Sequence, residues 1–576
     1  MSDFNPLDRA RINVHRSSFD LSSKKLFTAK VGEILPCYWQ IAIPDTKYRI
    51  SSDWFTRTVP VNTAAYTRIK EYYDFYAVPL RLISRALPQA FTQMTDYMTS
   101  ADSANKNSES LTSVPNTSLQ LISNALALAQ SSDSFDDVGL PFVYGSCKVL
   151  DLLGYGSFIA SGNSSKAAIS NAYLSFSPTS DDKNPLVYRV SQVVNLLPLF
   201  AYQKIYYDFF SNSQWEKHLA YSYNVDYWDG KSLLSLSPDM FKLRYANYPK
   251  DYFMGMLPNS QYGSVAVLPS VLSPTDNPSR VYAYTSGTGS VGSILNAASS
   301  SAVTVNNTST SVRYATLNSD LSALSIRATE YLQRWKEVVQ FSSKDYSDQM
   351  AAQFGIKAPE YMGNHAHYIG GWSNVISINE VVNTNLDTQD SQASIAGKGV
   401  GSNSGHTITY DCGAEHQVIM CVYHAVPMLD WDVSGQAPQL TVTAISDFPQ
   451  PAFDQLGMQP VPALNLINDK SRAADGSLGY NLRYWQWKSS IDTVHAGFRK
   501  GLAYRSWSAA LDGWDILTSS GTFNYQSMKV RPQQLNSIFL SQVSGSHSGV
   551  AYDQLLCNVN FQVYATQNLD RDGLPF

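Results

Sequence analysis

The clearest strand signal lies near the start of the chain, where the sequence reads Gly32-Glu33-Ile34-Leu35-Pro36-Cys37-Tyr38-Trp39-Gln40-Ile41-Ala42-Ile43-Pro44-Asp45. Apolar side chains occupy every second position from Leu35 to Ile43, so an extended backbone places them on one face. Pro44-Asp45 ends the run, because proline lacks the N–H that a strand ladder needs and aspartate favours turns. A second run, 72–78, is closed by Pro79 and is apolar on both faces, as is typical of a strand buried between layers.

The end of the chain repeats this signal. Apolar and polar residues alternate through 555–565, so one face of this strand packs on a core and the other meets solvent. The segment 416–426 is a nearly continuous apolar run, and Leu440, Val442 and Ala444 alternate with polar residues, which predicts two further strands. The chain is therefore expected to be mainly β, with strands near both of its ends.

Helical periodicity is confined to a few segments. A short amphipathic helix is predicted within 119–129. A second helix is predicted to follow Pro198, because proline is tolerated in the first turn and Tyr202, Ile205, Tyr206 and Phe209 then share a face. The clearest amphipathic pattern is 321–339, with an N-cap near Asn318-Ser319-Asp320, and it predicts a helix that packs on a neighbouring element.

Composition indicates an oligomer. The chain has 576 residues, of which 12% are aromatic and only 15% charged, against about 25% charged in ordinary soluble domains. Large uncharged surfaces follow, and association would bury them. The net charge of −5 argues against a polycation, so any contact with nucleic acid is expected to be local.

The five cysteines are widely spaced and include no C-x-x-C pair. This pattern argues against a disulfide or zinc framework and fits a reducing cytoplasm. Cys37 and Cys557 lie on the apolar side of alternating strands, which suits free cysteines acting as small core residues. We find no secretory signal at the N-terminus and no run of about 18 apolar residues that could span a bilayer.

Patterns that carry chemistry are weak. His365 and His367 would share a strand face, and a metal site would need His406 or Asp411 to come near them. Glu415-His416 and the pair Asp492 and His495 could act as acid and base, but the sequence favours structural hydrogen bonds for both pairs.

The segment 287–292 fits G-x-G-x-x-G, but it lies in a Ser-rich region with no strand predicted before it and no helix after it. We assign no catalytic residue, no cofactor and no metal ligand, and expect no enzymatic activity.

Four blocks near the N-terminus occur in an order that resembles the opening of a Microviridae major capsid protein, of the gokushovirus-like or Bacteroidetes-microvirus-like branch. They are Arg16-Ser17-Ser18-Phe19-Asp20-Leu21, Gly32-Glu33-Ile34-Leu35-Pro36, Arg57-Thr58-Val59-Pro60-Val61 and Tyr72-Tyr73-Asp74-Phe75-Tyr76-Ala77-Val78-Pro79-Leu80. Later blocks extend the resemblance at 195–208, 243–253, 354–356, 359–363, 456–460, 484–488 and 573–576.

The resemblance implies a structural protein of small bacteriophages with single-stranded DNA. Its fold would be an eight-stranded antiparallel jelly roll of the viral capsid type with long loop insertions that contain some helices. In that fold early strands such as Leu35–Ile43 pair or pack beside late ones such as Leu555–Ala565. About sixty copies would self-assemble into a T=1 icosahedral shell around a circular genome.

The implied partners are other copies of the chain, the DNA through weak local contacts, a small basic DNA-packaging protein, a pilot protein and a host surface receptor, with no membrane. The implied location is the virion capsid, assembled in the bacterial host cytoplasm.

Seven segments are expected along the chain. They are an N-terminal arm (1–30), the first jelly-roll strands (31–80), an insertion with a short helix (81–190), a helical and loop segment (191–262), a Ser/Gly/Asn-rich surface insertion (263–318), a helix and loop segment (319–415) and the C-terminal jelly-roll strands (416–576). Arg9, Arg11 and Arg16 of the arm are the candidate DNA-facing residues. The surface insertion is the candidate for host attachment.

Two other functions fit part of this pattern. A carbohydrate-active or carbohydrate-binding β-sandwich would also be rich in aromatics, and as an enzyme it would need two carboxylates about 5 to 10 Å apart. A single-stranded DNA-binding protein would need a basic groove.

Overall fold

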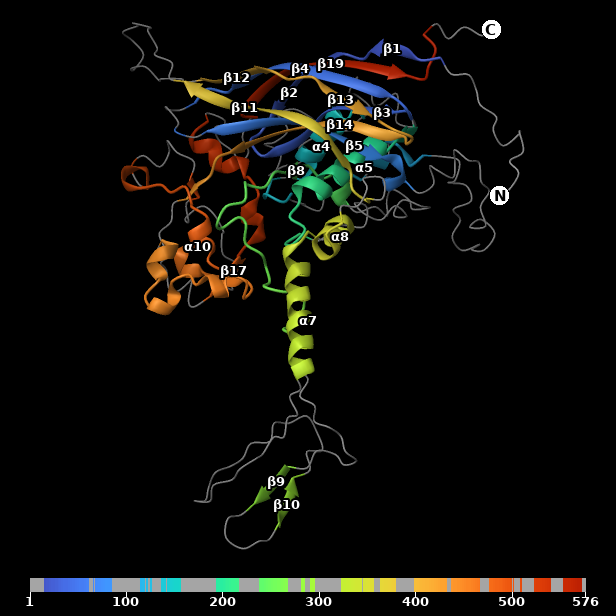
Figure 1. The fold of residues 1–576 in the computed structure, drawn as a ribbon. Coiled ribbons are helices and arrows are strands. Elements are labelled where there is room, and N and C mark those ends of the chain that lie inside the picture. The colour runs from blue at the N-terminus through green and yellow to red at the C-terminus, as the bar shows by residue number, and fades with distance from the viewer. Residues whose placement is uncertain are drawn as a thin grey trace, which may run out of the picture. The chain divides into compact units, whose positions relative to one another are not determined.

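The computed structural model describes residues 15–61, 66, 68–84, 114–119, 121–122, 125–126, 136–140, 142–156, 193–216, 238–267, 281–284, 291–295, 323–343, 345–356, 363–379, 398–431, 437–466, 476–499, 501, 508–509, 523–539 and 553–571. The chain divides into two compact units (Figure 1). One consists of Met1–Pro258 with Ser343–Phe576, and the other is Asn259–Ser342.

The first unit is built on an antiparallel 11-stranded sheet in the order β1-β19-β4-β12-β11-β5-β14-β3-β8, with β13 also paired to β4 and β2 to β19. The strands are β1 (Ser17–Asp20), β2 (Ser23–Ala29), β3 (Glu33–Ala42), β4 (Lys47–Thr58), β5 (Ile69–Pro79), β8 (Arg244–Tyr245), β11 (His367–Asn379), β12 (Lys398–Ser404), β13 (Ile408–Asp411), β14 (Gln417–Pro427) and β19 (Leu555–Gln567). The prediction of a mainly β, antiparallel fold is confirmed.

The two ends of the chain meet within this sheet. β19 lies between β2 and β4, so that Val559 is opposite Lys25 on one side and Trp54 on the other. β3 pairs instead with β14 and β8, and it packs on β19 through the rings of Tyr38 and Phe561, whose centroids are 5.4 Å apart. The predicted association of early with late strands is therefore confirmed.

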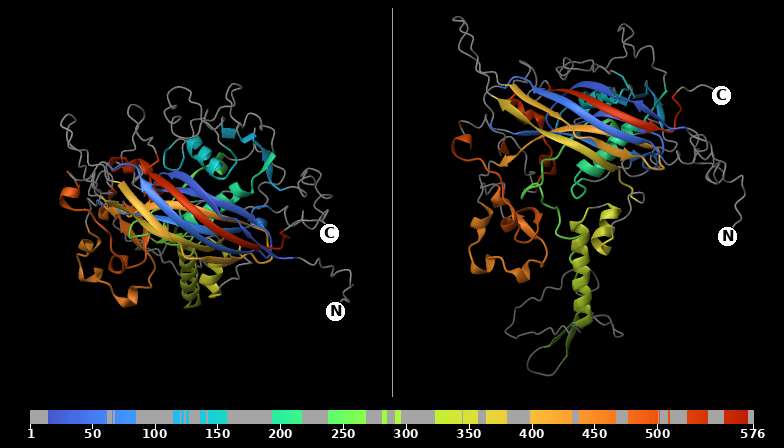
Figure 2. Two further views of the ribbon diagram at one scale, coloured as in Figure 1. Left: turned by 90° about the horizontal axis from the view of Figure 1, so that it is seen from above. Right: turned by 45° about the horizontal axis from the view of Figure 1, so that its top comes forward.

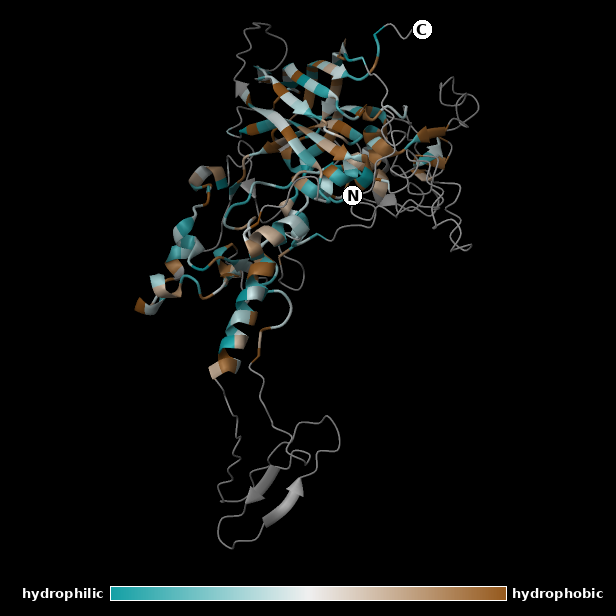
Figure 3. Cartoon of the chain, turned by 45° about the vertical axis from the view of Figure 1, so that its right-hand side comes forward, coloured by the Kyte–Doolittle hydropathy of each residue, from teal (hydrophilic) through white to brown (hydrophobic). Residues whose placement is uncertain are grey.

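The curl of the sheet brings its two halves face to face (Figure 2). β4 and β19 alternate buried with less buried residues along most of their length. The strands of the sheet carry both hydrophobic and hydrophilic residues (Figure 3). β14 is buried at every position, as its continuous apolar run predicts. Aromatic rings fill the space between the halves, including a contact of Trp54 with Tyr73 at 5.2 Å between centroids.

Two helices lie against the β3-β14-β5 half of the sheet (Figure 1). α4 (Phe142–Leu152) belongs to the predicted insertion 81–190, and α5 (Leu197–Ile205) follows Leu196 with Pro198 in its first turn, as predicted. A π-helical turn, Tyr206–Phe210, continues α5. The described residues within 119–126 are largely helical, as the predicted short helix requires.

One predicted strand is wrong. The alternation at Leu440, Val442 and Ala444 lies in a chain of short 3₁₀ helices, Pro438–Thr441, Ile445–Asp447 and Pro451–Phe453. Proline begins two of these helices and removes the donors that a strand ladder would need.

The remaining elements of this unit are short. They are β6 (Asn116–Ser118), β7 (Val193–Asn195), β15 (Asp430–Trp431), β16 (Gln459–Pro462), β17 (Ser477–Asn481), β18 (Ser508–Ala509), the helices α8 (Tyr346–Phe354) and α10 (Trp485–Lys488), and the 3₁₀ turns Leu80–Leu82, Pro238–Phe241, Ala463–Asn465, Ala496–Arg499, Tyr525–Met528 and Pro532–Ser537.

The second unit contains α7 (Ala323–Phe341) and a two-stranded hairpin of β9 (Val281–Tyr284) and β10 (Val291–Leu295). A strand therefore precedes the 287–292 glycine pattern, contrary to expectation, but a strand also follows it, so the helix that a dinucleotide site needs is missing. The helix predicted at 321–339 exists where described. Its apolar residues do not pack as expected, since Leu324 is 75% and Trp335 45% exposed.

All five cysteines are buried and free, so the prediction for Cys37 and Cys557 is confirmed. None of the helices in the described ranges is long and apolar enough to cross a bilayer.

Candidate functional site

The only predicted DNA-facing residue within the described ranges is Arg16, because Arg9 and Arg11 lie outside them. The Arg16 guanidinium forms an ion pair with the carboxylate of Asp45 and donates from Nε to Oδ1 of Asn568 at 2.7 Å. Arg16 therefore fastens the start of β1 to the turn after β3 and to the end of β19. Its side chain is still 38% exposed, so part of the guanidinium remains available to solvent.

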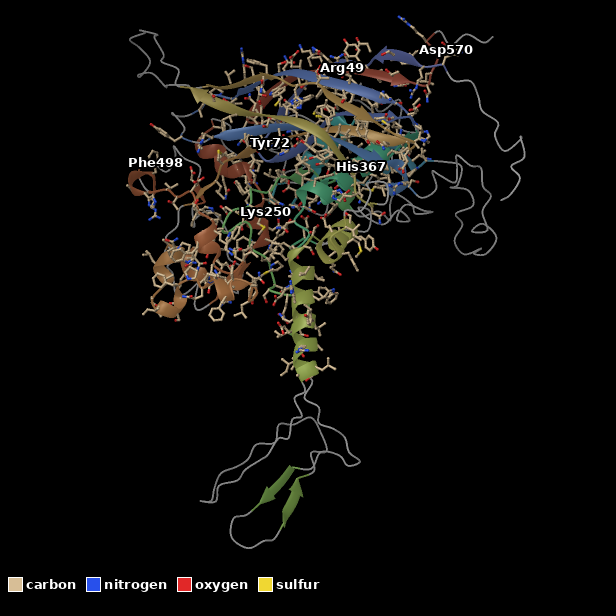
Figure 4. All side chains as sticks on the ribbon, viewed as in Figure 1. Arg49, Tyr72, Lys250, His367, Phe498 and Asp570 are labelled. Carbon is tan, nitrogen blue, oxygen red and sulfur yellow. The ribbon has the colours of Figure 1, made fainter. Side chains whose placement is uncertain are left out.

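The two histidines of the weak metal pattern serve the fold. His365 contacts backbone carbonyl oxygens with both ring nitrogens, Ala366 O at 2.9 Å and Asp208 O at 3.0 Å, so neither nitrogen points to an open coordination position. His367 lies at the start of β11, opposite Ala77 of β5 (Figure 4). Among the described residues, no three His, Cys, Asp or Glu side chains are arranged to hold a metal ion.

The two candidate acid–base pairs have other partners. Glu415 accepts a hydrogen bond from Nε of Arg81 at 2.8 Å, which ties the start of the 81–190 insertion to the sheet. The ring of His495 contacts the hydroxyl of Thr493 at 2.7 Å. Both contacts are structural, and neither brings an acid and a base together over an open cleft.

One group of charged side chains is buried in the interior, and we call it the Asp553 cluster: Lys30, Glu33, Lys148 and Asp553. Lys148 of α4 reaches the first residue of β3 and the segment before β19, with Nζ 2.5 Å from Glu33 Oε2 and 3.0 Å from Asp553 Oδ2. Lys30 Nζ lies 3.5 Å from Asp553 Oδ1. Each of these four side chains is at most 8% exposed.

The charges of the Asp553 cluster balance. Burial alone would raise the pKa of Asp553, but the ammonium groups of Lys148 and Lys30 lower it to about 2. The hydroxyl of Tyr144 also donates to Asp553, at 3.0 Å. Because a buried ion pair recovers its desolvation cost only when its geometry is well satisfied, this cluster selects one position of α4 against the sheet.

A second buried group, the Asp137 cluster, joins four further segments and consists of Asp137, Glu216, Lys242, Arg244 and Lys529. The carboxylate of Asp137 forms ion pairs with Nζ of Lys242 at 2.6 Å and with Nζ of Lys529 at 2.8 Å. Nη1 of Arg244 lies 3.5 Å from Oδ2 of Asp137. Burial opposes ionisation of Asp137, yet these cations hold its pKa well below the ordinary value.

Tyrosine and glutamine side chains complete the Asp137 cluster. Lys529 donates to the hydroxyl of Tyr206 at 2.7 Å, which in turn donates to Glu216 at 3.0 Å. Arg244 donates from Nε to Gln203 Oε1 at 2.8 Å. The cluster fixes the 136–140 loop, α5 and the segment 525–530 as one body.

The solvent side of the sheet carries an open groove of about 710 Å³ between β1, β4, β13 and β19, which we call the sheet-face groove. Its lining residues are Ser18, Lys47, Tyr48, Arg49, Thr409, Tyr410, Asp411, Tyr564 and Thr566. Lys47 is paired with Asp411 at 3.4 Å. Arg49 points outward from β4 (Figure 4) and is directly opposite Tyr564, a residue that is 48% exposed.

Sequence reasoning missed both clusters and the groove. A lysine inside an apolar segment, Lys148 in Phe142–Leu152, was an available signal, since lysine is rarely buried without a partner. The partner itself, Asp553, could not be identified because nothing local connects it to α4.

Comparison with known proteins identifies capsid proteins as similar to this chain. Residues 179–571 match the family model described as capsid protein (F protein). The capsid protein VP1 of Chlamydia phage 1 is 24% identical over 208 residues, a match that covers 34% of this chain and 34% of that protein. The alignment thus spans about a third of the relative's length.

The family match covers more than half of the chain and includes β8, β11, β14 and β19, together with α5 and Lys529. The resemblance to Microviridae major capsid proteins is confirmed, and the family is one of structural capsid proteins. The chain belongs to the phage capsid protein (F protein) family.

Proposed function

We propose that about sixty copies of this chain self-assemble into a T=1 icosahedral shell that encloses a circular single-stranded DNA genome. The observation that carries the proposal is the capsid family match over 179–571. The chain would then be located in the virion capsid and would assemble in the cytoplasm of a bacterial host.

The order of the strands supports an eight-stranded jelly roll as the framework of this shell. β2, β19, β4 and β12 are consecutive neighbours, and so are β3, β14, β5 and β11. In each group, strands from the first 80 residues alternate with strands from after residue 366. Two such interleaved antiparallel groups, packed face to face, are what a jelly roll requires. β1, β8 and β13 would be additions to it.

The buried clusters support a subunit that is rigid before it assembles. A closed shell needs every copy to present the same surfaces, so flexibly attached insertions would be costly. Lys148 joins the insertion 81–190 to Glu33 of β3 and to Asp553, and Asp137 joins it to Lys529, which also pairs with Glu216. The seven-segment division remains part of this proposal, with 263–318 as a surface insertion that meets the host receptor.

For the genome, we propose weak local contacts at the sheet-face groove and the N-terminal arm. Arg49 and Tyr564 side by side offer a cation for phosphate and a ring for a base, the combination that single-strand binders use. Arg16 would contribute only in part because Asp45 already pairs with it, whereas Arg9 and Arg11 remain candidates. The net charge of −5 leaves neutralisation of the DNA to counterions and a small basic packaging protein. A pilot protein would be a further partner.

Light scattering and negative-stain microscopy test the shell, on protein expressed alone and on particles from infected cells. We expect closed particles of uniform size, roughly 250–300 Å across when scaled from compact domains of this mass. A monomer or small oligomer from both sources would contradict the proposal. Turnover of polysaccharides would then favour the carbohydrate-active alternative, and salt-sensitive binding of single-stranded DNA by free subunits would favour the DNA-binding one.

The DNA contacts have their own test. In particles, Arg49→Gln and deletion of residues 1–14 are each expected to lower the DNA content or the salt resistance of packaging. Unchanged DNA-filled particles from both variants would remove these contacts from the proposal and leave the shell intact.

A further inference from the structure

A string of large apolar side chains lies in the open around α10. Ile445 is 87% and Leu440 71% exposed, and four other large apolar residues of this region are exposed by 43 to 64%. We call this surface the lobe patch, and it consists of Leu440, Ile445, Phe448, Phe453, Leu456 and Trp487. The patch is not an isolated apolar residue on a polar surface, which would need no explanation.

Contacts with α10 bring parts of the patch together. The rings of Phe448 and Trp487 lie 6.3 Å apart, and Gln439 donates to the carbonyl oxygen of Gln486 at 3.2 Å. The segment 437–456 therefore folds onto α10 (Figure 1). Its 3₁₀ helices are three or four residues long, too short to turn an apolar face inward, and this leaves the apolar residues outside.

Few charges lie within the patch. Asp447 accepts the backbone N–H groups of Thr443 at 3.0 Å and Ala444 at 2.9 Å, and Asp454 is paired with Lys488 at 2.5 Å. The segment 437–456 contains no lysine or arginine. Covering the patch would thus desolvate one ion pair and the Asp447 carboxylate, which backbone N–H groups stabilise without neutralising it. A low number of charged residues is the property that distinguishes the centre of a protein interface.

The size of the patch also fits an interface. From their exposed fractions, the six residues together expose roughly 700 Å², close to the roughly 800 Å² that one partner contributes to a standard stable interface. We propose that the lobe patch is a subunit contact, covered in the shell by a second copy of this chain. The inference rests on the proposed function, because it assigns a partner to a surface of the shell subunit.

The chemistry of the patch favours a protein copy over nucleic acid. DNA binding needs free cations along the backbone. Of the two cations beside α10, Lys488 is held by Asp454, and the guanidinium of Arg483 lies over the ring of Tyr484, 5.6 Å from its centroid, with Nε buried. Every copy in a shell presents the same patch, so leaving it uncovered would promote disordered aggregation rather than closure.

The test uses a cysteine at the most exposed residue of the patch, Ile445. Because the five native cysteines are buried, Ile445→Cys introduces a thiol that a maleimide reagent distinguishes easily. We expect Cys labelling at this position to be complete in unassembled subunits and at least tenfold slower in shells formed by the variant alone. Equal labelling rates in both states would overturn the inference.

A charge substitution provides the second readout. Ile445→Lys is expected to reduce shell yield at least tenfold, while Leu26→Lys, at a leucine of β2 that is 72% exposed, is expected to assemble. Unchanged circular dichroism and unfolding temperature would show that Ile445→Lys still folds. Normal assembly of Ile445→Lys would contradict the inference.

The outcomes separate the two proposals. If the unmodified chain forms no shells by itself or in infected cells, the proposed function fails. If it does form shells and the residue 445 thiol is protected only in particles that contain other proteins, a different component covers the patch and the inference alone is wrong.

Discussion

Lys148 and Asp553 are 405 positions apart in the sequence, and Lys148 Nζ lies 3.0 Å from Asp553 Oδ2 in the buried interior. This single contact joins a helix of the first insertion to the start of the last strand. The pair also touches Glu33 at the start of β3, so three distant parts of the chain depend on one ammonium group.

Replacing Lys148 with methionine is expected to destabilise the subunit by about 3–5 kcal/mol, because two buried carboxylates lose their main cation. The matched control is Lys488→Met, which removes a cation from an exposed pair with Asp454 and is expected to cost no more than about 1 kcal/mol. Urea unfolding of both variants measures the difference. Equal effects would mean that the Asp553 cluster contributes no more than a surface pair.

Acid unfolding should show how much the Asp553 cluster contributes to stability. The pKa of Asp553 is lowered in the folded protein to about 2, against an ordinary value of 3.8. Its stabilising contribution is therefore complete above pH 4 and is lost as the pH falls from about 4 to about 2. Unfolding followed by circular dichroism should show a loss of stability in this window. In Asp553→Asn the contribution of this residue to the acid limb should be absent.

The sequence predicted the strands well and the contacts between segments poorly. β3, β14 and β19 follow from local alternation or from continuous apolar runs, which depend only on residues a few positions apart. The alternation at Leu440, Val442 and Ala444 does not form the strand that it predicts. Pro438 and Pro451 begin 3₁₀ helices in this segment, and proline lacks the N–H that a strand ladder needs.

The candidate site is a different problem. The charge of Arg16 makes it a candidate for DNA contact. Whether its guanidinium binds DNA or pairs with an aspartate depends on the turn at Asp45, 29 positions away, which local sequence does not reveal. The periodicity of α7 predicts an apolar face that packs on another element. Periodicity alone cannot show whether the same chain supplies that element. Interactions that need distant segments, such as the Asp137 cluster, leave no mark in local sequence.

A buried carboxylate on β5 should make stability rise as the pH falls towards 5. Burial raises the pKa of Asp74 to about 6, although the hydroxyl of Tyr368 donates to it at 3.2 Å. His424, whose Nδ1 lies 3.9 Å from Asp74, stays neutral because burial lowers its pKa to about 3. The folded state thus binds a proton between about pH 6 and 4 that the unfolded chain has released, and stability decreases with pH there.

Asp74→Asn is expected to remove this contribution. At pH 8 the variant should be more stable than the unmodified chain by about 1–3 kcal/mol, a range that follows from a shift of about two pKa units discounted for partial solvation. At pH 4 the two should unfold at the same urea concentration. As an independent check, Tyr368→Phe removes the donor to the ionised carboxylate and should move the rise in stability to higher pH.

A side chain at Gly32 would be disfavoured both by the backbone conformation and by a steric clash. Its φ is +94°, and an added Cβ would lie 2.7 Å from Cβ of Val530. Gly139 has a similar φ of +81° but nothing within 4 Å. Gly139→Ala is therefore expected to cost only the backbone strain, about 1–2 kcal/mol, whereas Gly32→Ala should cost at least about 2 kcal/mol more. Thermal unfolding of both compares them, and equal costs would show that Val530 moves freely.

Phe561 tests whether the two halves of the sheet share one core. Its ring lies 5.4 Å from Tyr38 and 5.8 Å from Phe75, so Phe561→Ala opens a cavity between β19 and the β3-β14-β5 half and is expected to cost about 3–5 kcal/mol. Tyr564→Ala, on the solvent side of the same strand, is expected to cost less than about 1 kcal/mol. If both variants lose similar stability, β19 is held mainly by its strand pairing with β2 and β4. If only Phe561→Ala is severe, the aromatic contact between the halves carries the framework, and the same variant should also fail to form shells at temperatures where Tyr564→Ala still assembles.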